Sequence, residues 1–142
     1  MNMGNPGIHF GVSGNALVRA AEAMLRALGG AEVTFLFPLL QLPEDPSAEL
    51  GMVDPGVEEV RFSPVVVRNL VAEAGGPRRR LEFLVPAAAV TAELSSRNVA
   101  SAGALFDSAL GVMYDGDLFH IEGLTTEYFG GMAYLYRVAA VE

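Results

Sequence analysis

The clearest pattern of apolar and polar positions lies at the C-terminal end of the chain, in residues 117–142. Two runs alternate with a period of two, and the pair Gly130-Gly131 separates them. Such alternation is typical of half-buried strands joined by a tight turn. The pattern predicts a terminal hairpin with Phe119 buried. One face carries Phe119 and Ile121 in the first run, and Tyr134, Tyr136, Val138 and Ala140 in the second.

Residues 14–28 have the periodicity of a helix rather than of a strand. Ser13 or Asn15 is a suitable N-cap, and Gly29-Gly30 supplies the left-handed residue that commonly ends a helix. The predicted apolar stripe is narrow and rich in alanine, which favours packing flat against a sheet or a partner. It consists of Leu17, Ala21, Met24 and Leu28.

The middle of the chain predicts three further strand segments. Residues 33–40 are aromatic and β-branched, as is typical of strands, and Pro38 marks an end or an edge. Residues 60–72 alternate around Pro64, which indicates a bulge or an edge at that point. After a turn near residues 74–77, residues 81–85 predict an opposing strand, so the two form a second hairpin.

Two helical segments follow Pro86. Residues 87–90 predict a short helical turn, because proline is favoured at a first helical position. Ser101 predicts an N-cap for a compact helix that ends at Gly111. Asp115-Gly116 is then a strong turn signal before the terminal hairpin. The apolar positions of the compact helix are Ala102, Leu105, Phe106, Ala109 and Leu110.

These elements predict one domain over residues 1–142, of the α+β class and mainly antiparallel β. About half of the residues are apolar, which is enough for a single core. Strands that are adjacent in sequence and joined by turns favour antiparallel pairing. We expect a small β-barrel or half-open sandwich with an N-terminal helix and one further short helix.

Residues 41–59 interrupt this pattern with prolines, glycines and acids and no basic residue. Such a composition buries little surface, so the sequence predicts a long, acidic, mobile loop. Loops of this length in small domains are commonly functional. The acids are Glu44, Asp45, Glu49, Asp54, Glu58 and Glu59.

The charge balance argues against several classes of function. Nine basic residues, all arginine, face seventeen acids, and the formal net charge is −8. Phosphate backbones bind through Lys and Arg that release counterions, so tight nucleic-acid binding is not expected. Cysteine is absent, which excludes disulfides and thiolate metal sites. The first residues do not resemble a signal peptide, and the apolar runs are short, so we expect no membrane span and no secretion.

The sequence predicts no catalytic residue, no cofactor site and no metal site. Asp115 and Asp117 fall on the strand face opposite to His120, so these three side chains do not converge on a metal. The pair Glu122 and Glu127 flanks a predicted loop and is expected by chance among seventeen acids. No serine has the spacing of a nucleophile elbow, and no glycine motif of a nucleotide site follows a strand.

The remaining candidates are residues for interaction with other proteins. Arg78, Arg79 and Arg80 form the only basic cluster of the sequence, at the tip of the second predicted hairpin. If subunits assemble in a ring, this tip would meet the acidic segment of a neighbour and steer its orientation. The acidic candidates are Glu44, Asp45, Glu49 and Asp54.

Four stretches of the sequence belong to a recognisable order of elements: 63–68 (SPVVVR), 81–86 (LEFLVP), 116–123 (GDLFHIEG) and 133–138 (AYLYRV). This order resembles that of the small head-tail joining (neck) proteins of tailed phages and prophages. The resemblance covers roughly residues 60–142, with the N-terminal helix as a looser match. It implies a virion structural protein that docks as a ring between portal and tail, without catalysis, in the virion or the cytoplasm of a bacterial host. The long segment 41–59 and the helix at 101–110 depart from the family pattern.

Two hypotheses of function therefore stand. The first is a non-catalytic assembly protein that associates with itself or with other virion proteins. The second is a small-ligand-binding or enzymatic β-barrel with a pocket lined by Phe119, Tyr134 and Tyr136. Inward aromatic residues more often form a core than a pocket, which favours the first hypothesis.

Overall fold

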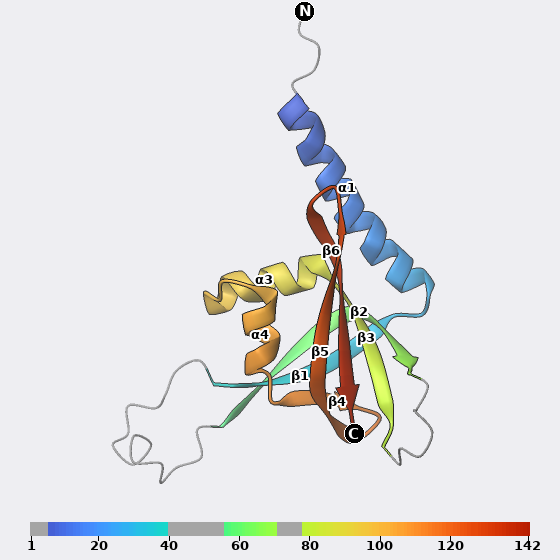
Figure 1. The fold of residues 1–142 in the computed structure, drawn as a ribbon, viewed down its shortest axis with the longest axis vertical. Coiled ribbons are helices and arrows are strands. Elements are labelled where there is room, and N and C mark those ends of the chain that lie inside the picture. The colour runs from blue at the N-terminus through green and yellow to red at the C-terminus, as the bar shows by residue number, and fades with distance from the viewer. Residues whose placement is uncertain (1–5, 40–55, 71–77) are drawn as a thin grey trace, which may run out of the picture.

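The computed structural model describes residues 6–39, 56–70 and 78–142, with side chains described from Ala16 onward. Six strands of the described chain form a closed barrel, and helices lie against its outside (Figure 1). The elements are α1 (Pro6–Ala27), β1 (Ala31–Pro38), β2 (Val57–Asn69), β3 (Arg80–Pro86), α3 (Ala87–Arg97), α4 (Ala102–Ser108), β4 (Gly111–Tyr114), β5 (Asp117–Phe129) and β6 (Met132–Val141).

The strand order around the barrel is β1-β2-β3-β6-β5-β4, and β4 closes the circle by pairing with β1. Every neighbouring pair is antiparallel. The predicted class is thus confirmed, and the barrel alternative holds over the half-open sandwich. Strand β4 was not predicted, because its four residues are too few to show a period of two.

Aromatic rings fill the inside of the barrel. The ring of Phe35 on β1 lies 5.0 Å from that of Phe62, 6.0 Å from that of Phe83 and 5.8 Å from that of Phe106, centroid to centroid. The first three rings come from neighbouring strands, and Phe106 comes from α4. Edge-to-face contacts of this kind add to the stabilisation from burial alone. The helix α4 is therefore part of the barrel core.

Helix α1 packs on the outside of the barrel through a narrower face than predicted. Leu25 is fully buried in a small cluster with Leu84 of β3 and Leu135 of β6. Met24 is 46% exposed and Leu28 is 62% exposed, so these two positions of the predicted stripe were wrong. Adjacent helical residues point about 100° apart, and only the Leu25 side of the helix faces the sheet.

The C-terminal end of α1 is a Schellman motif, as the glycine pair predicted. Gly29 has a φ of 86° and its N–H donates to the Arg26 carbonyl, while the Gly30 N–H donates to the Leu25 carbonyl at 2.8 Å. The predicted start was wrong. The helix begins at Pro6, so Ser13 and Asn15 lie within it rather than at its N-terminus.

Strand β2 begins at Val57, which corrects the boundary of the predicted acidic loop. Residues 57–59 pair with β1, with Glu58 opposite Phe37 and Glu59 opposite Leu36. Because Glu58 and Glu59 are acidic, the alternation of apolar residues does not reveal this part of the strand. Of the rest of the predicted loop, Gly56 is described, and residues 41–55 lie outside the described residues.

Pro64 lies at a bulge, as its position in the sequence indicated. Ala31 of β1 pairs with Val65, and Val33 pairs with Phe62, so one residue of β1 faces two of β2. The second hairpin is also confirmed, because β2 and β3 pair with Val67 opposite Phe83. The predicted turn at 74–77 lies outside the described residues.

The helices after Pro86 were predicted in part. The N-cap of α4 is confirmed, because the Ser101 hydroxyl accepts a hydrogen bond from the Ala104 N–H at 3.1 Å. The predicted end at Gly111 was wrong, since α4 ends at Ser108 and Gly111 begins β4. The predicted turn at 87–90 was too short, because α3 continues to Arg97 and ends at Asn98, whose φ is 53°. Exposed Thr and Ser residues in its second half hide the helical period.

The terminal hairpin is confirmed, and it projects beyond the barrel alongside α1 (Figure 1). Gly130 and Gly131 form its turn with φ values of 58° and 79°. The last pair between β6 and β3 is Leu135 with Pro86, so residues 128–134 have only each other as strand neighbours. The hairpin tip is therefore a two-stranded ribbon.

Candidate interaction surfaces

Arg79, one of the predicted interaction residues, is bound within its own chain. Its Nε lies 2.8 Å from Glu142, its Nη2 lies 3.0 Å from Asp117 and its Nη1 lies 4.0 Å from Asp115. The guanidinium also covers the Phe119 ring at 5.2 Å from the centroid. The hydrogen bond to Glu142 raises the pKa of Arg79. This arginine ties the start of β3 to the β4–β5 turn and to the last residue.

The other two arginines of the predicted cluster differ from each other. Arg80 lies 3.5 Å from Glu122, across from β3 to β5. Arg78 is exposed and has no ion pair in the described chain. Of the predicted basic tip, only Arg78 is therefore left without an acidic neighbour among the described residues.

The predicted acidic partners, Glu44, Asp45, Glu49 and Asp54, lie outside the described residues. All nine arginines and twelve of the seventeen acids lie within them, which leaves a net charge of −3 there. Five further acids, these four and Glu73, supply the rest of the total of −8. Most of the excess negative charge thus belongs to residues 40–55 and 71–77.

A ladder of ion pairs crosses the outer face of the sheet from β2 to β5. Glu82 on β3 lies 2.7 Å from Arg68 and 3.6 Å from Arg137, and Arg137 lies 2.8 Å from Glu127. Glu82 is only 8% exposed because the two arginines cover it. Glu122 and Glu127, weighed above as paired carboxylates, instead have different arginine partners.

Arg97 at the end of α3 was missed by sequence reasoning. Its side chain is 4% exposed, lies 2.7 Å from Glu58 and 2.8 Å from Glu93, and stacks 4.7 Å from the Phe37 ring centroid. Its Nη2 makes no aligned hydrogen bond, so the pairing with Glu58 is mainly electrostatic. The spacing of Glu93 and Arg97, four residues apart, was the signal for this pair. Arg97 fastens α3 to β1 and β2.

The weighed metal ligands do not meet. Asp115 and Asp117 turn toward Arg79, whereas His120 is exposed on β5. Within residues 6–39, 56–70 and 78–142, no group of three or more His, Asp or Glu side chains is arranged to hold a metal ion. Asp115, Asp117 and Glu142 gather instead around the single guanidinium of Arg79.

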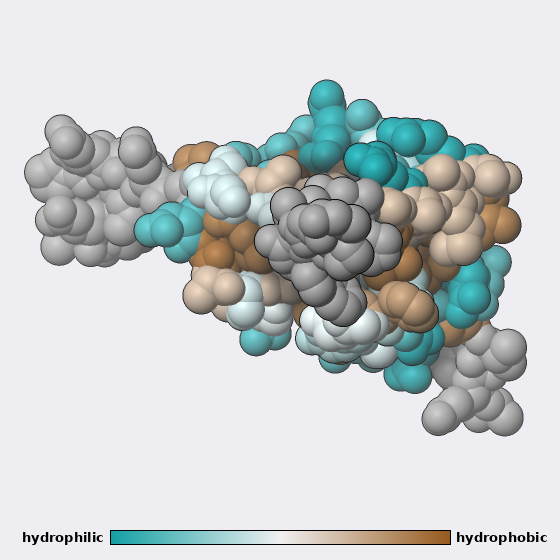
Figure 2. Space-filling view, turned by 90° about the horizontal axis from the view of Figure 1, so that it is seen from above, coloured by the Kyte–Doolittle hydropathy of each residue, from teal (hydrophilic) through white to brown (hydrophobic). Residues whose placement is uncertain are grey.

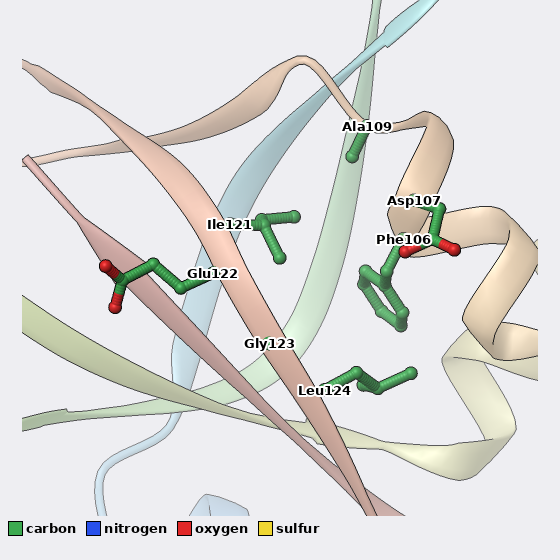
Figure 3. Close-up of a pocket in the computed structure, with 7 residues that line it drawn as sticks. All are labelled: Phe106, Asp107, Ala109, Ile121, Glu122, Gly123 and Leu124. Carbon is green, nitrogen blue, oxygen red and sulfur yellow. The ribbon is translucent and has the colours of Figure 1, made fainter.

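A small cavity of about 140 Å³ lies between α4 and β5 (Figure 3). Ile121, Leu124 and Phe106 point into the same space, and Glu122 points to the other side of β5 (Figure 3). Ligand pockets for small molecules have volumes of roughly 300 to 1,000 Å³. This cavity is smaller, and its acids do not converge in it. The remaining lining residues are Asp107, Ala109 and Gly123.

The three aromatic residues of the alternative hypothesis do not line one pocket. Phe119 and Tyr136 belong to the packed core, and Phe119 has no exposed surface. Tyr134 packs instead with the outer cluster under α1. The cause is a bulge, because Glu127 pairs with Leu135 while Tyr128 pairs with Ala133, which leaves Tyr134 as the extra residue.

Burial gives Tyr136 a measurable signature at alkaline pH. Desolvation, with a smaller effect from Tyr128, raises the pKa of the phenol above its ordinary value. The unfolded chain therefore loses this proton first as the pH rises above about 10, and stability present at neutral pH is lost. We expect urea unfolding at pH 8 and pH 11 to show a smaller alkaline loss for Tyr136→Phe than for the wild type. An equal loss would contradict this role.

Among the exposed apolar side chains of the described residues, two groups stand out, and neither was predicted. The hairpin-tip surface consists of Tyr128, Phe129 and Met132, which are 64%, 70% and 42% exposed. The barrel-wall surface consists of Leu110, Met113 and Leu118, which are 46%, 36% and 40% exposed, beside half-buried Leu36. Figure 2 shows the molecule from above the view of Figure 1, with hydrophobic areas between hydrophilic ones on that face. Apolar surface that stays exposed in a folded chain marks candidate contact sites.

The described residues thus form a small antiparallel β-barrel flanked by helices, with exposed apolar side chains at the hairpin tip and on the barrel wall. Comparisons of the chain with protein-family models, curated proteins and solved structures gave no match. None of the helices in the described residues has the length and apolar character to cross a membrane.

Proposed function

We propose that this protein is a non-catalytic structural component that assembles with copies of itself, as the neck proteins of tailed phages and prophages do. The place of action would be a virion or the cytoplasm of a bacterial host. The observation that carries this proposal is the projecting terminal hairpin. It carries Tyr128 and Phe129, 64% and 70% exposed, on a ribbon that the barrel does not cover.

The distribution of charge supports the same role. Arg79, Arg97 and Arg137 each hold two or more acids of their own chain, so these groups stabilise the barrel and do not form an open cationic surface. The remaining negative charge would make an assembled ring repel a phosphate backbone. Duplex DNA would pass such a ring without adhering to it.

The arrangement of the titratable side chains also agrees with a role that needs no reaction. The groups weighed as paired carboxylates or metal ligands, apart from His120, are engaged with arginines. The small cavity between α4 and β5 has an apolar wall of Phe106, Ile121 and Leu124. Shape, apolar contact area and charge are the properties on which an assembly component depends.

The test is the size of the purified protein as a function of concentration. Light scattering after size-exclusion chromatography should show species above the monomer mass of 15.0 kDa that grow with concentration. Negative-stain electron microscopy of the largest species should then show rings. A protein that stays monomeric up to millimolar concentration would contradict the proposal.

A further inference from the structure

The hairpin-tip and barrel-wall surfaces lie far apart on the same molecule. Leu118 and Phe129 are eleven residues apart on the one continuous strand β5. At about 3.3 Å per residue, roughly 36 Å separates them along the strand. Figure 1 shows the same separation, with β4 at one end of β5 and the hairpin turn at the other. One copy of the chain therefore cannot cover its own barrel-wall surface with its own hairpin tip.

The barrel-wall surface is a continuous row across three strands. Thr34 on β1 is in register with Met113 on β4, and Met113 is in register with Leu118 on β5. Helices α1 and α3 pack against β2, β3 and β6, and α4 packs against β5 near Leu124. Within the described residues, the main packing contacts of the helices are thus with strands other than β1 and β4, and Met113 and Leu118 stay exposed.

The hairpin-tip surface protrudes from the molecule, whereas the barrel-wall surface is broad. Residues 128–134 form a narrow ribbon that extends past the last pair with β3. Its apolar side chains stand on a protruding element, whereas those of the barrel-wall surface stand on a broad strand face. Phe129 and Met132 pair across the ribbon and lie on the same face of it. Such a protruding apolar pair and an open apolar face are complementary in form. Tyr and Phe are also enriched at the centres of protein interfaces.

Charges beside the two surfaces are complementary as well. Glu59 lies in register with Leu36 next to the barrel wall, is exposed, and has no ion pair within the described residues. Arg19 lies on α1, the helix alongside the hairpin, is exposed, and also has no ion pair there. The other arginine without an ion pair within the described residues is Arg78, and the remaining seven each have an acidic partner there. A contact between copies would bring opposite charges to its rim.

We propose that the hairpin-tip surface of one copy docks on the barrel-wall surface of a second copy. This inference rests on the proposed function, because it names the surfaces through which self-assembly takes place. The contact is heterologous, since each copy offers a tip to one neighbour and a wall to another. Such contacts build rings when the rotation closes and filaments when it does not.

The size of the surfaces predicts weak pairs and stable closed assemblies. Three exposed side chains on each side amount to a few hundred Å², below the roughly 800 Å² per partner of a standard interface. An isolated pair should therefore dissociate readily. In a closed ring each copy makes two contacts, and the second forms at high effective concentration.

The experiment uses one variant for each surface and a matched control. Phe129→Ser alters the tip, Leu118→Ser alters the wall, and Leu28→Ser removes an apolar side chain, 62% exposed, that belongs to neither. Circular dichroism and thermal unfolding verify the fold of each variant. In sedimentation velocity, the tip and wall variants should raise the concentration needed for assembly roughly tenfold or more, and Leu28→Ser should not.

Mixing the two surface variants then tests the heterologous geometry. The Leu118→Ser copy retains its tip, and the Phe129→Ser copy retains its wall, so the pair has one intact contact. Because a pair with one contact is weak, the mixture should form a one-to-one complex only at high concentration, where each variant alone is still monomeric. It should not form rings, because the second contact is broken at both surfaces.

The outcomes separate this inference from the proposed function. If the wild type assembles and both variants assemble equally well, these surfaces are the wrong ones while the assembly role stands. If Phe129→Ser does not assemble and its mixture with Leu118→Ser forms no one-to-one complex, the contact joins two tips. That result overturns the tip-to-wall geometry. A wild type that remains monomeric overturns both proposals.

Discussion

Replacing Phe119 by alanine should lower the free energy of unfolding by about 3 to 5 kcal/mol, the range for large aromatic truncations in cores. The Phe119 side chain has no exposed surface. Its ring lies 6.4 Å from those of Phe83 and Tyr114, and Arg79 covers it from outside. The truncation would remove these contacts and leave a cavity that a closed barrel cannot collapse to fill. Urea unfolding followed by circular dichroism measures the change.

The matched control is the next residue along the same strand. His120 is exposed on the opposite face of β5, so His120→Ala should change the free energy of unfolding by less than about 0.5 kcal/mol. If the two variants exchanged these results, β5 would have the opposite register. A small effect of both would mean that the barrel core does not include β5.

Replacing Leu25 by alanine should cost about 2 to 5 kcal/mol, because Leu25 is the buried leucine through which α1 meets the barrel. Its cluster contains Leu84 and Leu135, both 7% exposed. Few other buried side chains hold this helix, since Ala21 is the one further residue of its described part in the buried core. Urea unfolding measures the loss, and hydrogen exchange of the α1 amides should accelerate before that of β3.

Met24→Ala is the control for this second prediction. Met24 precedes Leu25 on the same helix, is 46% exposed, and belongs to the stripe that the sequence favoured. Its replacement should cost less than about 0.5 kcal/mol, because alanine also has a high helix propensity. A larger effect for Met24 than for Leu25 would show that the helix meets the barrel through the predicted stripe.

The strands with strong local signals could be predicted from the sequence. Alternation placed Phe119, Tyr136 and Val138 on the inner face, where the structure has them. The pairs Gly29-Gly30 and Gly130-Gly131 marked a helix end and a hairpin turn, because positive φ values strongly favour glycine. Each of these signals depends on a few consecutive residues. Prediction failed where bulges and packing intervened, as at Tyr134 and Met24.

The candidate sites were harder to predict, because ion pairs join residues far apart in sequence. Arg79 and Glu142 are sixty-three positions apart, yet their side chains form a hydrogen bond of 2.8 Å. The cluster 78–80 was therefore identified as a basic tip, although two of its three members hold acids of the same chain. The apolar surfaces escaped notice for a related reason. Whether a given leucine is buried or exposed depends on the packing of the closed barrel, and the sequence does not show it.

The sequence by itself determined an antiparallel, strand-rich fold with an N-terminal helix, two hairpins and an excess of acids, since period, turn residues and composition are local properties. Only the tertiary structure decided that the strands close into a barrel, that α1 docks through Leu25, and that Arg79 and Arg97 are neutralised. It also decided that Phe129 and Leu118 stay exposed at opposite ends of β5. These outcomes depend on contacts between residues that are far apart in the sequence. Burial of apolar side chains and pairing of charges in the folded barrel decide which of these contacts form.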